Sequence, residues 1–302
     1  MSGALHARIE VHAERPEQLE RAAAEAFEAG ALGLEERDGP PAALCVYVLA
    51  DAAAAVCAAL GALPGIRLGE VEALPERAWS EAWKEGLEPI VISERLLVRP
   101  SFRAAPAGFR GAELVIEPGQ AFGTGGHAST RLALEAIDAL PPALLAGARV
   151  LDVGCGSGVL ALAALALGAE RALACDIDPL ATAATRRAAR ENGFPRRLVA
   201  FTGSLAALGA RADGVFELVV ANLLRRELEP LLAAIARLRA PGGAVLLSGL
   251  LASDLPPLEA CLVGLGLRTL ASREAAEPSG DAWLSLLVGD PRALSQGLVS
   301  KR

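Results

Sequence analysis

The stretch ARVLDVGCGSGVLALAALALG, residues 148–168, decides the fold class. Its first part is a nearly continuous apolar run, typical of a strand covered on both faces of a parallel sheet. Its second part predicts a helix, and the turn between them is rich in glycine. Residues 171–178 predict a second strand, and residues 179–193 predict a second helix with Asp178 as its N-cap. This repetition of strand, turn and helix predicts an α/β fold.

The alternation continues outward to the end of the chain. From about residue 107, strands alternate with helices of roughly ten to fifteen residues, the rhythm of a mostly parallel sheet covered on both faces. Further strands are expected at 216–223, 242–251, 267–274 and 281–289, with helices at 230–240 and 253–266. We therefore assign residues 107–293 to one domain and residues 294–302 to a tail.

The N-terminal quarter has a different pattern. In residues 1–75, segments of period 2 and period 3.6 follow one another as β-α-β-β-α-β. That order predicts a small α+β domain of the ferredoxin-like type. Residues 76–106 are predicted to be a linker that docks on a neighbouring domain, because Trp79 and Trp83 stand four residues apart and would share one face of a helix.

Charge is distributed unevenly between these domains. Residues 1–75 hold 5 basic and 12 acidic residues, which accounts for the whole net charge of −7. An acidic lobe repels phosphate backbones, so we expect no direct binding of nucleic acid. It could attract a basic polypeptide, although acidity for solubility is the commoner reason.

Composition also bounds the location and the chemistry. No apolar run reaches the ~18 residues of a membrane span, and the N-terminus does not resemble a signal peptide. We expect a cytoplasmic monomer without membrane contact. The five cysteines form no CxxC pair and the three histidines are scattered, which predicts free thiols and no metal site.

The glycine-rich turn indicates a ligand site. Gly154, Gly156 and Gly158 let the backbone approach a ligand, and the helix that follows offers free amide donors. The dinucleotide-binding fingerprint requires its third glycine where this chain has Val159. The pattern D-x-G-x-G-x-G therefore favours S-adenosylmethionine over a nicotinamide cofactor.

Two carboxylates accompany the turn. Asp176 ends the next predicted strand, where it could accept both ribose hydroxyls of a nucleoside. Asp152 could hold the geometry of the turn or approach the amino-acid portion of the cofactor through water. Asn222 ends the predicted strand 216–223, at a sheet edge where its carbonyl and adjacent backbone carbonyls could accept hydrogen bonds from an amine. Alternatively, Asn222 only caps the following turn.

The loop EPGQAFGTGGHAST, residues 117–130, adds the most specific signal. Together with LDVGCGSG, CDIDPLA, ANLL and SGLLASD, it resembles the bacterial methyltransferases of large-subunit ribosomal protein eleven, the PrmA family. The resemblance covers essentially the whole chain. It implies a ferredoxin-like recognition domain, a Trp-containing linker and a Rossmann-like, seven-stranded class I methyltransferase domain. It also implies methyl transfer from S-adenosylmethionine to lysine ε-amines and an N-terminal α-amine of that ribosomal protein.

The resemblance assigns roles to individual residues. Thr130, Gly154, Asp176 and Asn222 match the cofactor-contacting positions of the family, and Phe122 would form a flap with the glycines beside it. Thr130 could instead simply open a helix. His127 could orient the loop or meet the substrate, and it could equally bond only loop backbone.

The chain departs from the family pattern at two places. The loop has Gly126, Ala128 and Ser129 where GTGTHPTT is common, which could alter its stiffness. Two arginines, Arg225 and Arg226, follow Asn-Leu-Leu where relatives more often have small or uncharged residues. The second departure puts substrate contacts near Arg225 in question.

For the reaction, we expect Asn222 and the Leu223 carbonyl to aim the acceptor nitrogen while Phe122 excludes water. Two alternatives stay open. The chain could be a related protein-lysine methyltransferase with another protein target, or a non-catalytic module that binds adenosylmethionine. A nicotinamide-dependent oxidoreductase is disfavoured by Val159 and by the lack of a Tyr and Lys pair, since Tyr47 lies in the other domain.

Overall fold

The computed structural model describes residues 6–13, 16–37, 43–74, 87–117, 127–276 and 282–290. They belong to two compact units, one within residues 1–87 and one within residues 88–302, and each is described by itself. The division falls inside the segment that the sequence assigns to a linker. Trp79 and Trp83 lie outside the described residues, so their shared helix face stays a prediction.

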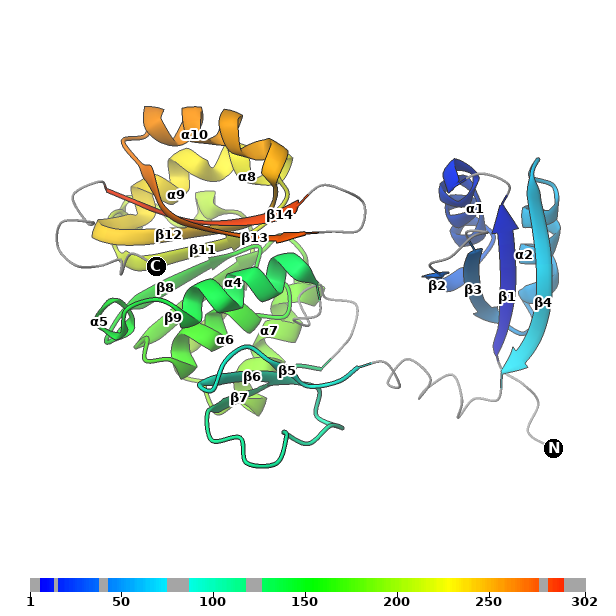
Figure 1. The fold of residues 1–302 in the computed structure, drawn as a ribbon, viewed down its shortest axis with the longest axis horizontal. Coiled ribbons are helices and arrows are strands. Elements are labelled where there is room, and N and C mark those ends of the chain that lie inside the picture. Colours follow the sequence, from blue (N-terminus) through cyan, green and yellow to red (C-terminus); the bar gives the residue numbers. More distant parts are fainter. Residues whose placement is uncertain are drawn as a thin grey trace. The chain divides into compact units, whose positions relative to one another are not determined.

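The N-terminal unit is a four-stranded antiparallel sheet with two helices (Figure 1). The strands are ordered β2-β3-β1-β4 across the sheet. Along the chain the elements are β1 (His6–Ala13), α1 (Pro16–Glu28), β2 (Ala31–Arg37), β3 (Ala43–Leu49), α2 (Ala53–Gly61) and β4 (Ile66–Leu74). The β-α-β-β-α-β order predicted from the sequence is therefore confirmed.

Strand alternation divides this sheet into a core face and a charged face. In β1 every second residue is buried, and Ile9 and Val11 are fully enclosed. They share a hydrophobic core with Ala22 of α1 and Val56 of α2. Residues of the other parity stay accessible, and Arg8 pairs with Glu72 of β4 at 2.7 Å. The polar face is thus free of the helices that cover the apolar one.

The C-terminal unit is built on a seven-stranded sheet in the order β10-β9-β8-β11-β12-β14-β13. The first five strands are parallel, and β14 is antiparallel to both β12 and β13. The strands are β8 (Arg149–Val153), β9 (Arg171–Asp176), β10 (Leu198–Thr202), β11 (Phe216–Asn222), β12 (Arg239–Leu251), β13 (Arg268–Ala276) and β14 (Ala282–Gly289). This confirms the predicted α/β fold with a seven-stranded sheet.

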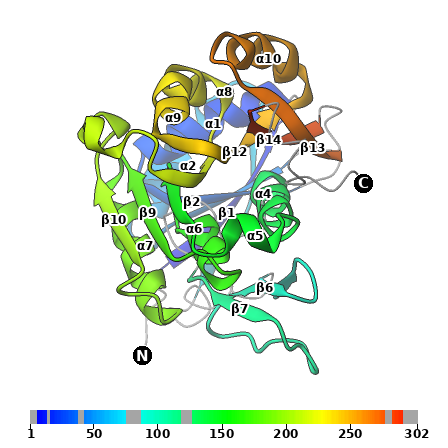
Figure 2. The ribbon, with the colours of Figure 1, turned by 90° about the vertical axis from the view of Figure 1, so that its left-hand side faces the viewer.

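Helices cover both faces of this sheet (Figures 1 and 2). One face carries α4 (Ala128–Asp138), α5 (Pro142–Leu145), α6 (Val159–Ala166) and α7 (Pro179–Glu191). The other carries α8 (Arg225–Leu228), α9 (Leu232–Leu238) and α10 (Leu255–Gly264). Short 3-10 turns lie at η1 (Leu205–Ala207), η2 (Ala210–Ala212), η3 (Glu229–Leu231) and η4 (Ala252–Asp254). No helix among the described residues is long and apolar enough to cross a membrane.

Local chemistry explains where these elements begin and end. Asp178 caps α7, as predicted, by accepting a hydrogen bond from Leu180 N at 2.8 Å. The uniformly apolar α6 is buried along nearly its whole length because it packs on β8 and β9 and against α4 and α7. The helix predicted over 230–240 ends earlier, at Leu238, because Arg239 already pairs with β11.

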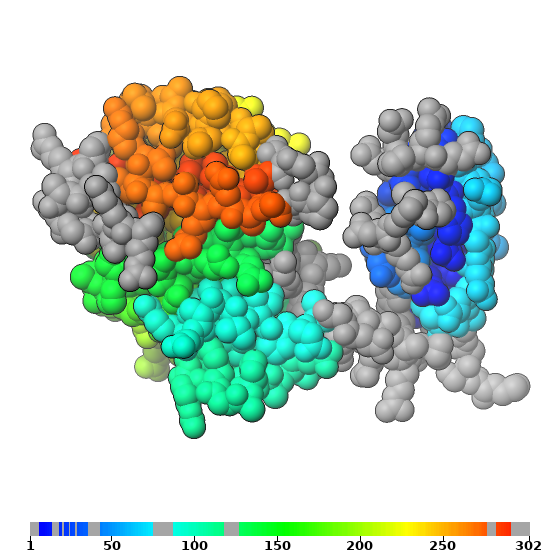
Figure 3. Space-filling model, viewed as in Figure 1, coloured from blue at the N-terminus to red at the C-terminus, as the bar shows by residue number. Residues whose placement is uncertain are grey.

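A small three-stranded sheet completes the unit. It consists of β5 (Ile90–Val91), β6 (Leu96–Arg99) and β7 (Ala112–Val115), with β6 in the centre. Its buried leucines, Leu96 and Leu114, join the core beneath α4 and α6. In the space-filling view, this cyan sheet, the green residues above it and the orange C-terminal segments form one continuous surface (Figure 3).

Candidate active site

A pocket of about 740 Å³ lies at the carboxyl ends of the central strands of the C-terminal unit. It is lined by residues at the ends of β8, β9 and β11, including Gly154, Asp176 and Asn222. The chain runs outward from β8 to β9 and β10, and then returns to place β11 on the other side of β8. Such a reversal of strand order leaves a crevice where ligands of open α/β sheets bind.

The glycine turn is held by backbone hydrogen bonds. Gly154 N and Cys155 N both donate to Cys175 O, at 2.8 and 3.1 Å. Gly154 has a φ of +69°, and a Cβ there would lie 2.5 Å from Leu223 Cδ2. A side chain at this position would thus both strain the backbone and collide with the pocket wall. The fold therefore requires glycine where the sequence predicts close approach of a ligand.

Asp176 is the last residue of β9 and lines the pocket. Its Oδ2 accepts a hydrogen bond from Gly156 N at 3.0 Å, and its Oδ1 accepts one from Asp178 N at 3.0 Å. These bonds fix the carboxylate between the glycine turn and the start of α7. Its free lone pairs remain available to hydroxyl donors, as the sequence predicts for a nucleoside.

Asp152 lies behind the pocket wall, not on it. Only 1% of its surface is exposed, and its Oδ2 accepts a hydrogen bond from Ala161 N at 3.1 Å. Burial, reinforced by the charge of Asp176, raises the pKa of Asp152 to about 7, although the bond from Ala161 opposes the shift. The structure thus places this carboxyl where it ties the end of β8 to α6.

Two thiols belong to the pocket lining. Burial raises the pKa of Cys155, and it raises the pKa of Cys175 to about 12. Both thiols therefore stay protonated and act as small apolar groups. Both are free cysteines, as predicted. Among the described residues, no three histidine, cysteine or acidic side chains are grouped as metal ligands.

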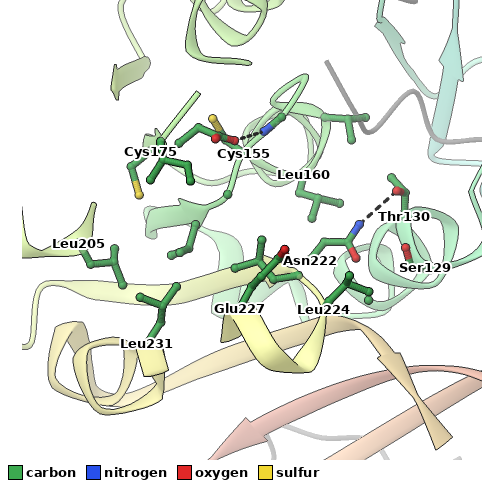
Figure 4. Close-up of a pocket in the computed structure, with 18 of the residues that line it drawn as sticks. Ser129, Thr130, Cys155, Leu160, Cys175, Leu205, Asn222, Leu224, Glu227 and Leu231 are labelled. Atoms are coloured by element: carbon green, nitrogen blue, oxygen red, sulfur yellow. Dashed lines mark hydrogen bonds between the residues drawn. The ribbon is translucent and has the colours of Figure 1, made fainter. Parts of the chain in front are cut away.

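Asn222 and Thr130 are bonded to each other in the pocket lining. Asn222 Nδ2 donates a hydrogen bond to Thr130 Oγ1 at 3.1 Å, drawn as a dashed line in Figure 4. The Oδ1 atom of Asn222 is buried and has no hydrogen-bond partner among the described residues. A Cβ on Gly249 would lie 2.9 Å from this oxygen and 2.8 Å from Leu223 O. Two acceptor oxygens therefore converge on one point of the pocket lining.

His127 caps α4 and lines the same pocket. Its Nδ1 lies 2.8 Å from Ser129 Oγ and accepts a bond from Ser129 N at 3.3 Å. The ring contacts Trp283 edge-on, with 4.7 Å between ring centroids. The predicted flap residue, Phe122, lies outside the described residues.

The pocket residues that were not singled out from the sequence include Trp283 at the start of β14, Glu227 in α8 and Leu231 in η3. Glu227 carries the second carboxylate among the lining residues, on the Asn222 side of the pocket (Figure 4). No local motif marks these positions, and only their spacing after Asn222 could have indicated Glu227 and Leu231.

Comparisons with known proteins agree with the motifs. The family model described as ribosomal protein L11 methyltransferase (PrmA) matches residues 44–271. A ribosomal protein L11 methyltransferase of Parasynechococcus marenigrum is 43% identical over 211 residues, which are 67% of this chain and 70% of that protein. The protein of the same name from Deinococcus radiodurans is 40% identical over 265 residues, 85% of this chain and 89% of that protein.

A solved structure supports the same conclusion. The crystal structure of the ribosomal protein L11 methylase from Lactobacillus delbrueckii subsp. bulgaricus matches with a TM-score of 0.59 and 30% sequence identity. The match covers 67% of this chain and 98% of that chain. The resemblance predicted from the sequence is thereby confirmed, and the chain belongs to the ribosomal protein L11 methyltransferase (PrmA) family.

Proposed function

We propose that this chain is an S-adenosylmethionine-dependent methyltransferase that modifies ribosomal protein L11 on lysine ε-amines and on the N-terminal α-amine. The observation that carries this proposal is the pair of acceptor oxygens, Asn222 Oδ1 and Leu223 O, which lie beside Gly249 and belong to residues that line the same pocket as Asp176. A nucleoside site and an amine site in one pocket are what methyl transfer to nitrogen requires.

The residues of the pocket fit the cofactor. Asp176 would accept the ribose hydroxyls, and the backbone at Gly154 and Gly156 would lie against the methionine portion. Thr130 would contact the same portion from α4. Asp152 would not contact the cofactor directly; it would hold the glycine turn in place by accepting the hydrogen bond from Ala161 N. When bound, S-adenosylmethionine supplies a methyl group on a sulfonium, which is already a strong electrophile.

The protein's own contribution is positioning and desolvation. Asn222 Oδ1 and Leu223 O would accept hydrogen bonds from the acceptor amine and direct its lone pair into the pocket. A free lysine has a pKa of about 10.4, so it must lose a proton before it can react. Apolar lining residues, Leu224 and Leu231 among them, would favour the neutral amine by excluding water. For Phe122, a role in excluding water rests on the sequence alone.

The remaining assignments follow from the organisation of the chain. Residues 1–75, as a ferredoxin-like domain, would select the protein substrate, and residues 76–106 would link it to the catalytic domain at 107–293. Residues 294–302 would form a tail. The acidity of residues 1–75 suits a basic ribosomal protein. We propose a monomeric enzyme of the cytoplasm without direct nucleic-acid contacts.

Mass spectrometry of purified ribosomal protein L11 after incubation with the enzyme and S-adenosylmethionine tests this proposal. We expect added methyl groups on lysines and the N-terminus. Unmodified L11, with another protein labelled in the same cell lysate, would indicate a different target. If no protein in the lysate is labelled, the chain is a non-catalytic module that binds adenosylmethionine. Deleting residues 1–75 should abolish modification of L11 and spare cofactor affinity.

A further inference from the structure

Strand β12 contains an irregularity beside the pocket. Its pairing with β14 matches Leu247 to Leu286 and Leu250 to Leu284. Two residues of β12, Ser248 and Gly249, therefore oppose the single residue Ser285 of β14. An extra residue of this kind is a β-bulge, which redirects side chains and is over-represented near active sites. The bulge occupies the SGLL segment.

Ser248 makes contacts in two directions from this bulge. It is completely buried. Its Oγ donates a hydrogen bond to Ser129 O in α4 at 2.8 Å, and its own carbonyl accepts one from Leu223 N at 3.0 Å. One residue thus joins the first turn of α4 to the end of β11, two segments that lie far apart in the sequence.

These bonds close a ring with the contact described above. On one side of the ring, Asn222 is hydrogen-bonded to Thr130, the neighbour of Ser129 in α4. On the other side, Ser248 is hydrogen-bonded both to Ser129 and to Leu223, the neighbour of Asn222. A closed network of hydrogen bonds holds its side chains in place better than a single bond does, because each bond limits the movement of the groups that form the others. The two oxygens that face the amine site belong to Asn222 and Leu223.

Gly249 completes the arrangement. It has a φ of +78°, in the left-handed region that favours glycine. A side chain at this position would collide with Asn222 Oδ1 and Leu223 O. The bulge therefore supplies the hydroxyl that is bonded to α4 and, one residue later, a position beside the two oxygens that carries no side chain.

We propose that Ser248 is a positioning residue, whose hydroxyl fixes Asn222 Oδ1 and Leu223 O in the orientation that receives the acceptor amine. This inference rests on the proposed function. Ser248 does not line the pocket, so it acts only through Ser129 and Leu223.

The test compares Ser248→Ala with Ser248→Thr, which keeps the hydroxyl. Ser285→Ala is the matched control, because Ser285 is also a buried serine of this sheet and its Oγ has no hydrogen-bond partner among the described residues. The kcat of each variant is measured with ribosomal protein L11 as the methyl acceptor. We expect Ser248→Ala to lower kcat about 10- to 100-fold, Ser248→Thr to restore most of it, and Ser285→Ala to match the wild type.

A second readout needs no turnover. Sinefungin has a carbon in place of the sulfonium sulfur and an amine in place of the methyl group, whereas S-adenosylhomocysteine is a thioether without a group at the methyl position. We expect the wild type to bind sinefungin more tightly than S-adenosylhomocysteine, and calorimetry should show that Ser248→Ala lowers this ratio roughly tenfold while its affinity for S-adenosylhomocysteine changes less than about threefold. Thermal unfolding of each variant reports on the fold.

The outcomes are distinguishable. If the wild type does not methylate L11, the proposed function fails, and the sinefungin ratio still decides the role of Ser248. The inference is overturned if Ser248→Ala keeps kcat within about threefold of the wild type, or if kcat, product affinity and thermal stability fall together without rescue by threonine. Should Ser248→Ala be insoluble, Gly249→Ala decides: its methyl group obstructs both oxygens, so a wild-type kcat would contradict the proposal.

Discussion

The two sides of the pocket differ in how fully the protein satisfies their polar atoms. At the end of β9, both oxygens of Asp176 accept backbone hydrogen bonds, from Gly156 N and Asp178 N. At the end of β11, Asn222 Nδ2 is bonded to Thr130, but the buried Oδ1 has no partner among the described residues. A buried acceptor without a partner costs stability, ~1 to 3 kcal/mol.

This difference separates two tasks. The β9 side is fixed by the fold itself, since its carboxylate and the turn that it faces hold each other. On the β11 side, the amide of Asn222 is held by Thr130 while its Oδ1 lacks a hydrogen-bond donor among the described residues. A ligand that donates a hydrogen bond to this oxygen would remove the cost of leaving it unsatisfied. We therefore expect changes at Asp176 to act on cofactor affinity and changes at Asn222 to act mainly on turnover.

The largest effect is expected for Asn222→Ala. Removing the amide deletes one of the two oxygens that we propose to orient the amine, so kcat for L11 should fall about 100- to 1,000-fold. Asn192→Ala is the matched control, because Asn192 is bonded to Val115 of β7 away from the pocket. That variant should lose stability and retain kcat. Full turnover by Asn222→Ala at saturating L11 would contradict the division of tasks.

A smaller effect is expected for the pH dependence of stability, which involves Asp152, the carboxyl that holds the glycine turn in front of Asp176. The raised pKa of Asp152 means that the folded protein holds a proton that the unfolded chain releases. Between about pH 4 and pH 7, unfolding therefore releases a proton, and stability from this group falls as the pH rises, by up to about 1.4 kcal/mol per pH unit.

Asp152→Asn should remove that part of the pH dependence while keeping an acceptor for Ala161 N. Urea unfolding at several pH values measures it, with Asp178→Asn, an exposed carboxyl at a helix start, as the control. If Asp152→Asn and the wild type have parallel stability curves from pH 4 to pH 7, the carboxyl is ionised in the folded protein and burial does not raise its pKa.

The smallest effect is expected for Glu227→Gln. This carboxylate lines the pocket together with Asn222, where it could attract the proposed cationic acceptor before deprotonation. Because it is exposed, its loss should raise the KM for L11 only about two- to threefold, and less at high salt. Glu229→Gln, a neighbouring change in η3, should leave KM unaltered. Equal effects of the two variants would mean that only net charge matters.

The sequence predicts the fold well because strand and helix periodicities are local properties. The turn at Gly154, the helix cap at Asp178 and the strand ends at Asp176 and Asn222 all lie where the pattern indicates. What joins them depends on contacts distant in sequence. The bond from Asn222 to Thr130 spans 92 positions, and the bond from Ser248 to Ser129 spans 119.

Other features have no signal in the sequence at all. The apolar segments 242–251 and 281–289 predict two strands, but not that Ser248 and Gly249 share one partner. Trp283 reaches His127 only because β14 inserts between β12 and β13. Asp152 could be either a turn-holding or a water-bridging group by its motif, and its burial against Ala161 N follows from the packing of α6.

One calorimetric measurement tests the division of tasks most directly: titration of S-adenosylhomocysteine into the wild type, Asp176→Ala and Asn222→Ala, with NADH as a competing ligand. We predict tight binding by the wild type, an affinity about 10- to 100-fold weaker for Asp176→Ala, less than about tenfold weaker for Asn222→Ala, and no displacement by NADH. Absence of heat with the wild type, tight binding of NADH, or equal losses in the two variants would contradict it.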